Sequence, residues 1–137
     1  MSKVHPASKF VGFPFLDRGR TPSGCDCWGL VRLYYKDKYD IDLPSYVDEY
    51  EASTVKGLTA EAINAHIAEW GHIPPGEEQE GDVILLRVGG LPCHIGVVVK
   101  RGYMLHTMKG CDSVIEPYIS PDWKHRVVGF YRYRRKA

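Results

Sequence analysis

The sequence predicts an α+β fold in a single domain that spans residues 1–137. A helical pattern of apolar residues dominates the first half of the chain, and short β-rich runs separated by glycine fill the second half. No internal repeat, low-complexity tract or change of composition marks a second domain. We therefore expect helices first and an antiparallel sheet after them.

Composition limits the classes of function. The chain has 137 residues, enough to bury a core without disulfide or metal cross-links. It carries 18 Lys and Arg against 17 Asp and Glu, so no overall field attracts nucleic acid or an anionic membrane surface. No apolar stretch is long enough to span a membrane. We expect neither a nucleic-acid partner nor membrane insertion.

Residues 1–23 are rich in proline, glycine and charge, which predicts an irregular lead-in. This segment lacks the uninterrupted apolar core of a signal peptide, so we expect a protein that is made in the cytoplasm without one. The four cysteines are too few for a secreted disulfide scaffold. Free thiols are expected.

The first helix is expected from Cys27 to about Tyr39. Asp26 is a suitable N-terminal cap, which places Cys27 in the first turn. The apolar side chains that form one stripe of this helix are Leu30, Val31, Tyr34 and Tyr35.

A second helix is expected over residues 60–70, where Thr59 can cap its start and Gly71 can end it. The β-rich runs that follow predict strands at 83–88, 94–99, 103–107, 113–116 and 127–133.

Cys27 is the first candidate for chemistry. Backbone N–H groups and the helix dipole favour negative charge at a helix start, so a thiolate forms more easily there. Taken alone, the same cysteine is more typical of a small buried apolar residue. A nucleophilic thiolate also needs an imidazole from elsewhere in the chain.

His94 is the leading candidate for that imidazole, because it opens an otherwise apolar strand. A further histidine, His106, lies in the next strand. If residues 100–102 form a three-residue hairpin loop with Gly102 in the left-handed region, His106 opposes Gly96 and lies diagonally next to His94. A two-residue loop would place the two histidines on opposite faces.

Five blocks of sequence, in this order, resemble the NlpC/P60 family of bacterial cell-wall hydrolases, and most of all members carried in phage tail modules. The blocks are Asp26-Cys-Trp-Gly-Leu-Val31, Gly81-Asp-Val-Ile84, His94-Ile-Gly-Val-Val98, His106, and Gly129-Phe-Tyr-Arg132. The resemblance runs from about Gly24 to the C-terminus.

This resemblance implies a papain-like fold, with the nucleophile at the start of a helix that packs on an antiparallel sheet. It implies a cysteine endopeptidase with Cys27 as nucleophile, His94 as general base and then acid, and His106 as the residue that orients His94. The implied substrate is a peptidoglycan stem peptide, other phage tail proteins are implied partners, and incorporation in a phage tail is the implied location. We expect neither a metal nor a cofactor.

Two departures from the family pattern concern substrate binding. Trp28 stands where many members have serine, and residues 15–20 replace a Tyr-Gly-Gly-type segment. Asp26 is retained, and the resemblance implies that it meets the free amine of the stem peptide. Trp28 fits either a wall of the cleft or the core side of the helix.

Other interpretations use the same residues. A zinc site could draw on Cys25, Cys93 and Cys111 with the candidates above, but Cys25-x-Cys27 and Cys93-His94 lack the usual ligand spacing. The basic end at 132–136 could suggest nucleic acid, but a last strand with one solvated face explains it better. A transamidase, or a non-enzymatic tail assembly component on the same fold, also remains open.

Overall fold

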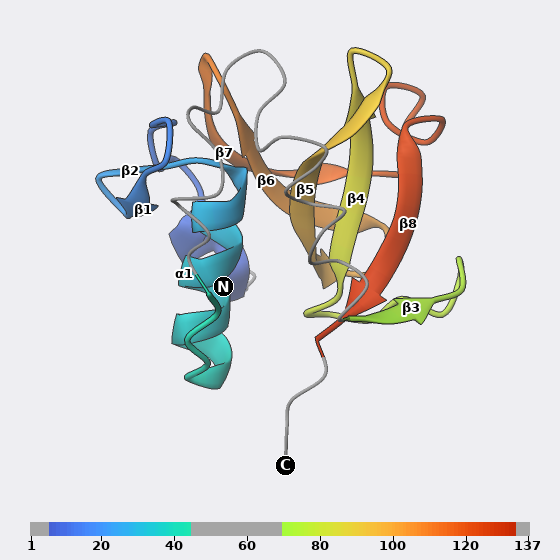
Figure 1. Cartoon of the computed structure of the whole chain (residues 1–137), viewed down its shortest axis with the longest axis horizontal. Helices are drawn as coiled ribbons and strands as arrows, with labels where there is room; N and C mark the ends of the chain where they lie inside the picture. Colours follow the sequence, from blue (N-terminus) through green and yellow to red (C-terminus); the bar gives the residue numbers. More distant parts are fainter. Residues whose placement is uncertain (1–5, 45–69, 134–137) are drawn as a thin grey trace, which may run out of the picture.

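The computed structural model of the protein describes residues 6–44 and 70–133. In this part of the chain, an α-helix lies beside a twisted six-stranded sheet with the order β3-β8-β4-β5-β6-β7 (Figure 1). Every neighbouring pair in the sheet is antiparallel. The elements are η1 (Pro6–Phe10, a 3-10 helix), β1 (Arg20–Thr21), β2 (Gly24–Cys25), α1 (Cys27–Tyr39), β3 (Gly71–Ile73), β4 (Val83–Val88), β5 (Leu91–Lys100), β6 (Tyr103–Met108), β7 (Cys111–Pro117) and β8 (Val127–Arg132).

The α+β class and the five expected strands are confirmed. Each predicted run lies in, or overlaps, one of the strands β4 to β8. The structure adds β3, a three-residue edge strand that pairs with the end of β8. Three residues are too few to show the alternation by which a strand is recognised in a sequence.

The first helix is also confirmed, with α1 beginning at Cys27 and ending at Tyr39. The Asp26 carboxylate caps it, because Oδ1 accepts a hydrogen bond from the backbone N–H of Gly29 at 2.7 Å. Asp40 ends it in the left-handed region, with φ of 53°. The buried stripe of α1 packs against β5 and β6. The helix expected over 60–70 lies outside the described residues.

Two short elements, η1 and β1, lie in the segment for which an irregular lead-in was expected. β1 pairs with β2 in a two-stranded ribbon that leads directly into α1 (Figure 1). The chain approaches itself closely here, since a Cβ on Gly19 would lie 2.3 Å from the carbonyl oxygen of Gly24. The ribbon therefore fixes the chain where the helix begins.

A bidentate ion pair joins the end of β8 to the residue that precedes β4. Arg132 Nε and Nη2 donate to Asp82 Oδ1 and Oδ2 at 2.8 and 2.9 Å, and the backbone N–H of Gln79 also donates to Oδ2. Asp82 is buried, whereas the Arg132 side chain is 43% exposed. Solvent therefore screens part of the attraction.

We expect Asp82→Asn to lower the free energy of unfolding by about 1–2 kcal/mol, because one charge-assisted bond is lost and a buried donor is left poorly paired. Urea titration of both proteins measures the difference. Asp42→Asn is the matched control, since Asp42 forms its ion pair with Lys36 at the exposed surface. Equal stability of Asp82→Asn and the wild type would contradict this account of the ion pair.

Candidate active site

Cys27 lies at the N-terminal end of α1 and is 3% exposed. It belongs to the hydrophobic cluster that the helix forms with the sheet, and this cluster also contains Ile95 of β5 and Leu105 of β6. Ile95 follows His94 in the chain, and Leu105 precedes His106. The helix start and the two strand segments that carry the histidines therefore contribute to one packed region.

The start of α1 is held by a buried ion pair. Arg20 Nη1 donates to Asp26 Oδ1 at 2.9 Å, and the Asp26 side chain is fully buried. Oδ1 therefore serves both the helix cap and the guanidinium. The N–H groups of the first helical turn lack intrahelical acceptors, which makes this end of α1 the place where a thiolate or an oxyanion is stabilised. The role of Asp26 toward a substrate amine stays a prediction.

The neighbouring thiol, Cys25, is fully buried and lies beside the Asp26 carboxylate. Burial, followed by the charge of Asp26, raises the pKa of Cys25 to about 12. Cys25 therefore stays protonated near neutral pH and is a poor nucleophile. Cys25, Cys93 and Cys111 form no disulfide bond, and only Cys111 among these three is exposed.

His94 and His106 are brought together as the sequence predicted. His94 Nε2 lies 2.9 Å from His106 Nδ1, and both side chains are buried. A register shift between β4 and β5 falls next to His94, and a second one, between β6 and β7, falls next to His106. Such irregularities commonly redirect side chains beside active sites.

The β5–β6 hairpin explains the contact between the two rings. The loop has two residues, Arg101 and Gly102, rather than the three expected, because Lys100 pairs with Tyr103. Gly102 has φ of +95°, and a register shift between Val98 and Lys100 restores the expected pairing, so that Val97 pairs with Leu105 and Gly96 faces His106. A Cβ on Gly96 would lie 3.1 Å from the Cβ of His106. The absence of a side chain at Gly96 leaves the room in which His106 reaches diagonally to His94.

Two further side chains, Glu116 and Trp123, adjoin the histidine pair, and no sequence pattern predicted a role for either of them. His106 Nε2 lies 2.5 Å from Glu116 Oε2, and Trp123 Nε1 donates to Glu116 Oε1 at 3.3 Å. The Trp123 ring stacks on His94, with centroids 5.9 Å apart, and meets His106 edge-on at 5.1 Å. The alternation of β7 could have placed Glu116 on the side of His106, but only if the β6–β7 register were known.

Burial sets the charge state of both imidazoles. It lowers the pKa of His94 well below the ordinary value, and the neighbouring His106 lowers it further. Burial also lowers the pKa of His106, although the hydrogen bond and charge of Glu116 oppose this. Both rings are therefore neutral near pH 7, as a general base must be before it takes up a proton.

Acid is therefore expected to destabilise the fold. Both histidines have a lower pKa in the folded chain than the ordinary 6.5, so the unfolded chain binds more protons below that pH. Their contribution is fully present above about pH 6.5 and is lost as the pH falls, by up to about 1.4 kcal/mol per pH unit for each group. Urea unfolding at about pH 7.5 and about pH 5 should show a larger loss for the wild type than for His94→Gln. Equal losses would contradict the buried neutral state of His94.

Trp28 lies on the core side of α1. Its ring packs edge-on against Trp70 with centroids 6.1 Å apart, its Nε1 donates to the carbonyl of Pro44 at 2.9 Å, and the residue is 4% exposed. This placement favours the second of the two roles considered for Trp28. Its contact with a substrate stays a prediction.

Within residues 6–44 and 70–133, no group of three or more His, Cys, Asp or Glu side chains is arranged to hold a metal ion. In the same residues, no helix is long and apolar enough to cross a membrane.

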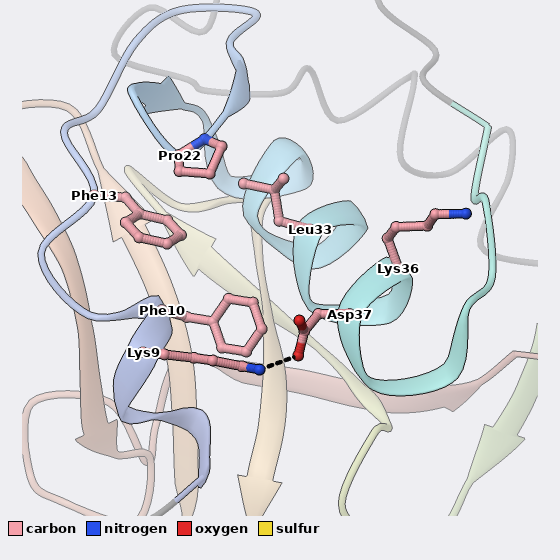
Figure 2. Close-up of a pocket in the computed structure, with 7 residues that line it drawn as sticks. All are labelled: Lys9, Phe10, Phe13, Pro22, Leu33, Lys36 and Asp37. Atoms are coloured by element: carbon pink, nitrogen blue, oxygen red, sulfur yellow. Dashed lines mark ion pairs between the residues drawn. The ribbon is translucent and has the colours of Figure 1, made fainter.

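A surface pocket of about 490 Å³ lies between η1 and α1 (Figure 2). Lys9 and Asp37 form an ion pair across it. Its lining residues are Lys9, Phe10, Phe13, Pro22, Leu33, Lys36 and Asp37. Because none of the candidate catalytic residues lines this pocket, it is not the site of the chemistry.

The model of the NlpC/P60 family matches residues 12–132. Tail tip assembly protein K of Escherichia phage N15 is 28% identical over 126 residues, which are 88% of this chain and 50% of that protein. Murein DD-endopeptidase MepS/Murein LD-carboxypeptidase of Escherichia coli is 24% identical over 108 residues, or 79% of this chain and 49% of that protein. The chain thus spans about half the length of these curated relatives. A solved NLP/P60 family structure from Staphylococcus aureus has a similar fold, with a TM-score of 0.66, 23% identity, and coverage of 95% of this chain and 39% of that one.

Proposed function

Because this chain belongs to the NlpC/P60 family, we propose that it is a cysteine endopeptidase that hydrolyses amide bonds in peptidoglycan stem peptides. The observation that carries the proposal is the buried His94–His106 hydrogen bond, on two strands that pack against the helix beginning at Cys27. This arrangement supports a Cys27–His94–His106 triad within a single peptidase domain.

In the proposed reaction, Sγ of Cys27 attacks the amide carbonyl carbon while His94 takes the thiol proton. Backbone N–H groups at the start of α1 stabilise the resulting oxyanion. His94 then returns the proton to the amide nitrogen, the C–N bond breaks, and the amine leaves. Water attacks the thioester with His94 as base, which releases the carboxylic acid and restores the thiol. His106 holds the His94 ring in position throughout.

The substrate class is supported by the murein endopeptidase among the relatives. Asp26 and Trp28 remain the proposed substrate contacts, and Asp26 would meet a free amine of the stem peptide. Since the Asp26 carboxylate already accepts bonds from Arg20 and Gly29, an amine would have to share it with the helix cap.

The proposal is tested by incubating purified peptidoglycan with the protein, measuring new amino groups and determining the masses of the soluble fragments. We expect amino groups to appear in step with peptide fragments, whose masses identify the bond that is cut. A folded protein that releases no fragments from peptidoglycan of several stem-peptide types would contradict the proposal. New amide bonds in the products, without net release of amine, would instead indicate a transamidase.

A second candidate function is that of a tail assembly component, which the phage N15 relative favours by its name. In that case the fold serves as a binding module, and the chain becomes part of a phage tail. Purified tails that contain the protein, together with no amine release from peptidoglycan, would favour this role. A protein with both properties would be a tail-borne peptidase.

A further inference from the structure

Glu116 and Trp123 extend the histidine pair beyond the triad. His106 faces Gly96 on β5 and pairs with Val114 on β7. His94 lies two positions before Gly96, and Glu116 lies two positions after Val114. This regular offset puts His94, His106 and Glu116 on one diagonal across β5, β6 and β7. The contacts along it are 2.9 Å between the histidines and 2.5 Å from His106 to Glu116.

The direction of the hydrogen bonds along this diagonal follows from the acceptor at its end. A carboxylate only accepts hydrogen bonds, so His106 must carry its proton on Nε2, where it faces Glu116 Oε2. A neutral His106 then presents the lone pair of Nδ1 to His94. His94 must therefore carry its proton on Nε2, which leaves its Nδ1 without a proton and able to act as a base.

Trp123 donates a hydrogen bond to the other carboxylate oxygen of Glu116. Its Nε1–H can only donate, and it faces Oε1 at 3.3 Å. The same indole ring stacks on His94 and contacts the edge of His106, so it covers the hydrogen bond between the two histidines. Arg126 lies over the Trp123 ring, 5.4 Å from its centroid, and this cation–π contact helps to hold the ring in place.

We propose that Glu116 is a positioning residue that, with Trp123, selects the tautomer of His106 and thereby keeps Nδ1 of His94 unprotonated as the catalytic base. This inference deepens the proposed peptidase function and rests on it. Neither side chain needs to touch the substrate. The carboxylate acts on the chemistry only through the two imidazoles.

Glu116→Gln is the sharpest test, because glutamine keeps the shape of the side chain but replaces the carboxylate, which only accepts hydrogen bonds, with an amide that also donates them. Trp123 Nε1–H still demands an acceptor, so the new amide oxygen faces Trp123 and its NH2 group faces His106. His106 Nε2 must then accept, both tautomers reverse, and Nδ1 of His94 carries the proton. We expect kcat for peptidoglycan cleavage to fall about 10–10²-fold, while KM stays within about twofold of the wild type.

A second variant tests the direction of the bonds. In Glu116→Gln/Trp123→Phe the indole donor is gone and an aromatic ring remains, so the glutamine can turn its oxygen back to His106. We expect the double variant to recover about tenfold in kcat over Glu116→Gln. Glu77→Gln is the matched control at an exposed glutamate and should leave kcat unchanged. A double variant no faster than Glu116→Gln would overturn the role given to Trp123.

Nitrogen-15 NMR of the imidazole rings gives a readout that does not depend on hydrolysis. We expect Nε2–H tautomers for His94 and His106 in the wild type and Nδ1–H tautomers in Glu116→Gln. Unchanged tautomers and unchanged kcat in Glu116→Gln would overturn the inference. A wild type with the expected tautomers but without activity on peptidoglycan would instead contradict the proposed function and leave the role of Glu116 standing.

Discussion

Cys27→Ala is expected to abolish the proposed release of peptides from peptidoglycan, with a fall in kcat/KM of at least about 10³-fold. The reason is that alanine has no atom that can form the thioester. Direct attack of water on the amide, helped only by the remaining residues of the site, is expected to be much slower. Because the side chain is buried and small, the variant should stay folded. Amine release and a thermal unfolding curve, measured on the same preparation, separate loss of chemistry from loss of fold.

Cys111→Ala is the matched control for this experiment, since Cys111 is the exposed thiol. It should keep the activity of the wild type. If Cys27→Ala kept more than a small part of the wild-type rate while Cys111→Ala did not, the nucleophile would have been assigned to the wrong cysteine.

His94→Gln is expected to lower kcat by about 10³-fold or more, because the thiol of Cys27 loses its base and the departing amine loses its acid. Glutamine is preferred to alanine here, because His94 is buried and a cavity would add a loss of stability. The measurement is kcat for amine release across the pH range, together with urea unfolding at neutral pH.

His72→Gln is the control for His94→Gln. His72 lies exposed on the edge strand β3 and contacts Tyr131. It should leave kcat unchanged. A His94→Gln protein that is folded and fully active would remove His94 from the mechanism.

The triad candidates could be predicted from the sequence because each has a local signature. Cys27 follows a capping residue at the start of an amphipathic helix, and His94 opens an apolar strand. His106 became a partner of His94 through the β5–β6 hairpin, where a two-residue loop with Gly102 in the left-handed conformation and a register shift between Val98 and Lys100 together give the pairing that a three-residue loop was expected to give. Short-range patterns and one turn were therefore enough.

Glu116 and Trp123 could not be predicted in the same way. The position of Glu116 depends on the register of β6 and β7, which shifts between His106 and Met108. Trp123 lies in turns between β7 and β8, where no period relates a residue to the sheet. The ion pair of Arg20 with Asp26 likewise depends on the path of the β1–β2 ribbon. Contacts of this kind follow from tertiary packing rather than from local pattern.

The central claim, that Cys27 is the nucleophile of a peptidoglycan peptidase, is tested most directly by blocking its thiol reversibly. Methyl methanethiosulfonate is added in increasing amounts to Cys111→Ala, the fraction of Cys27 modified is measured by peptide mass spectrometry, and amine release from peptidoglycan is followed in parallel. We predict that activity falls in proportion to the modified fraction of Cys27 and returns when a thiol reductant removes the label. Full activity in protein whose Cys27 is completely modified would contradict the account.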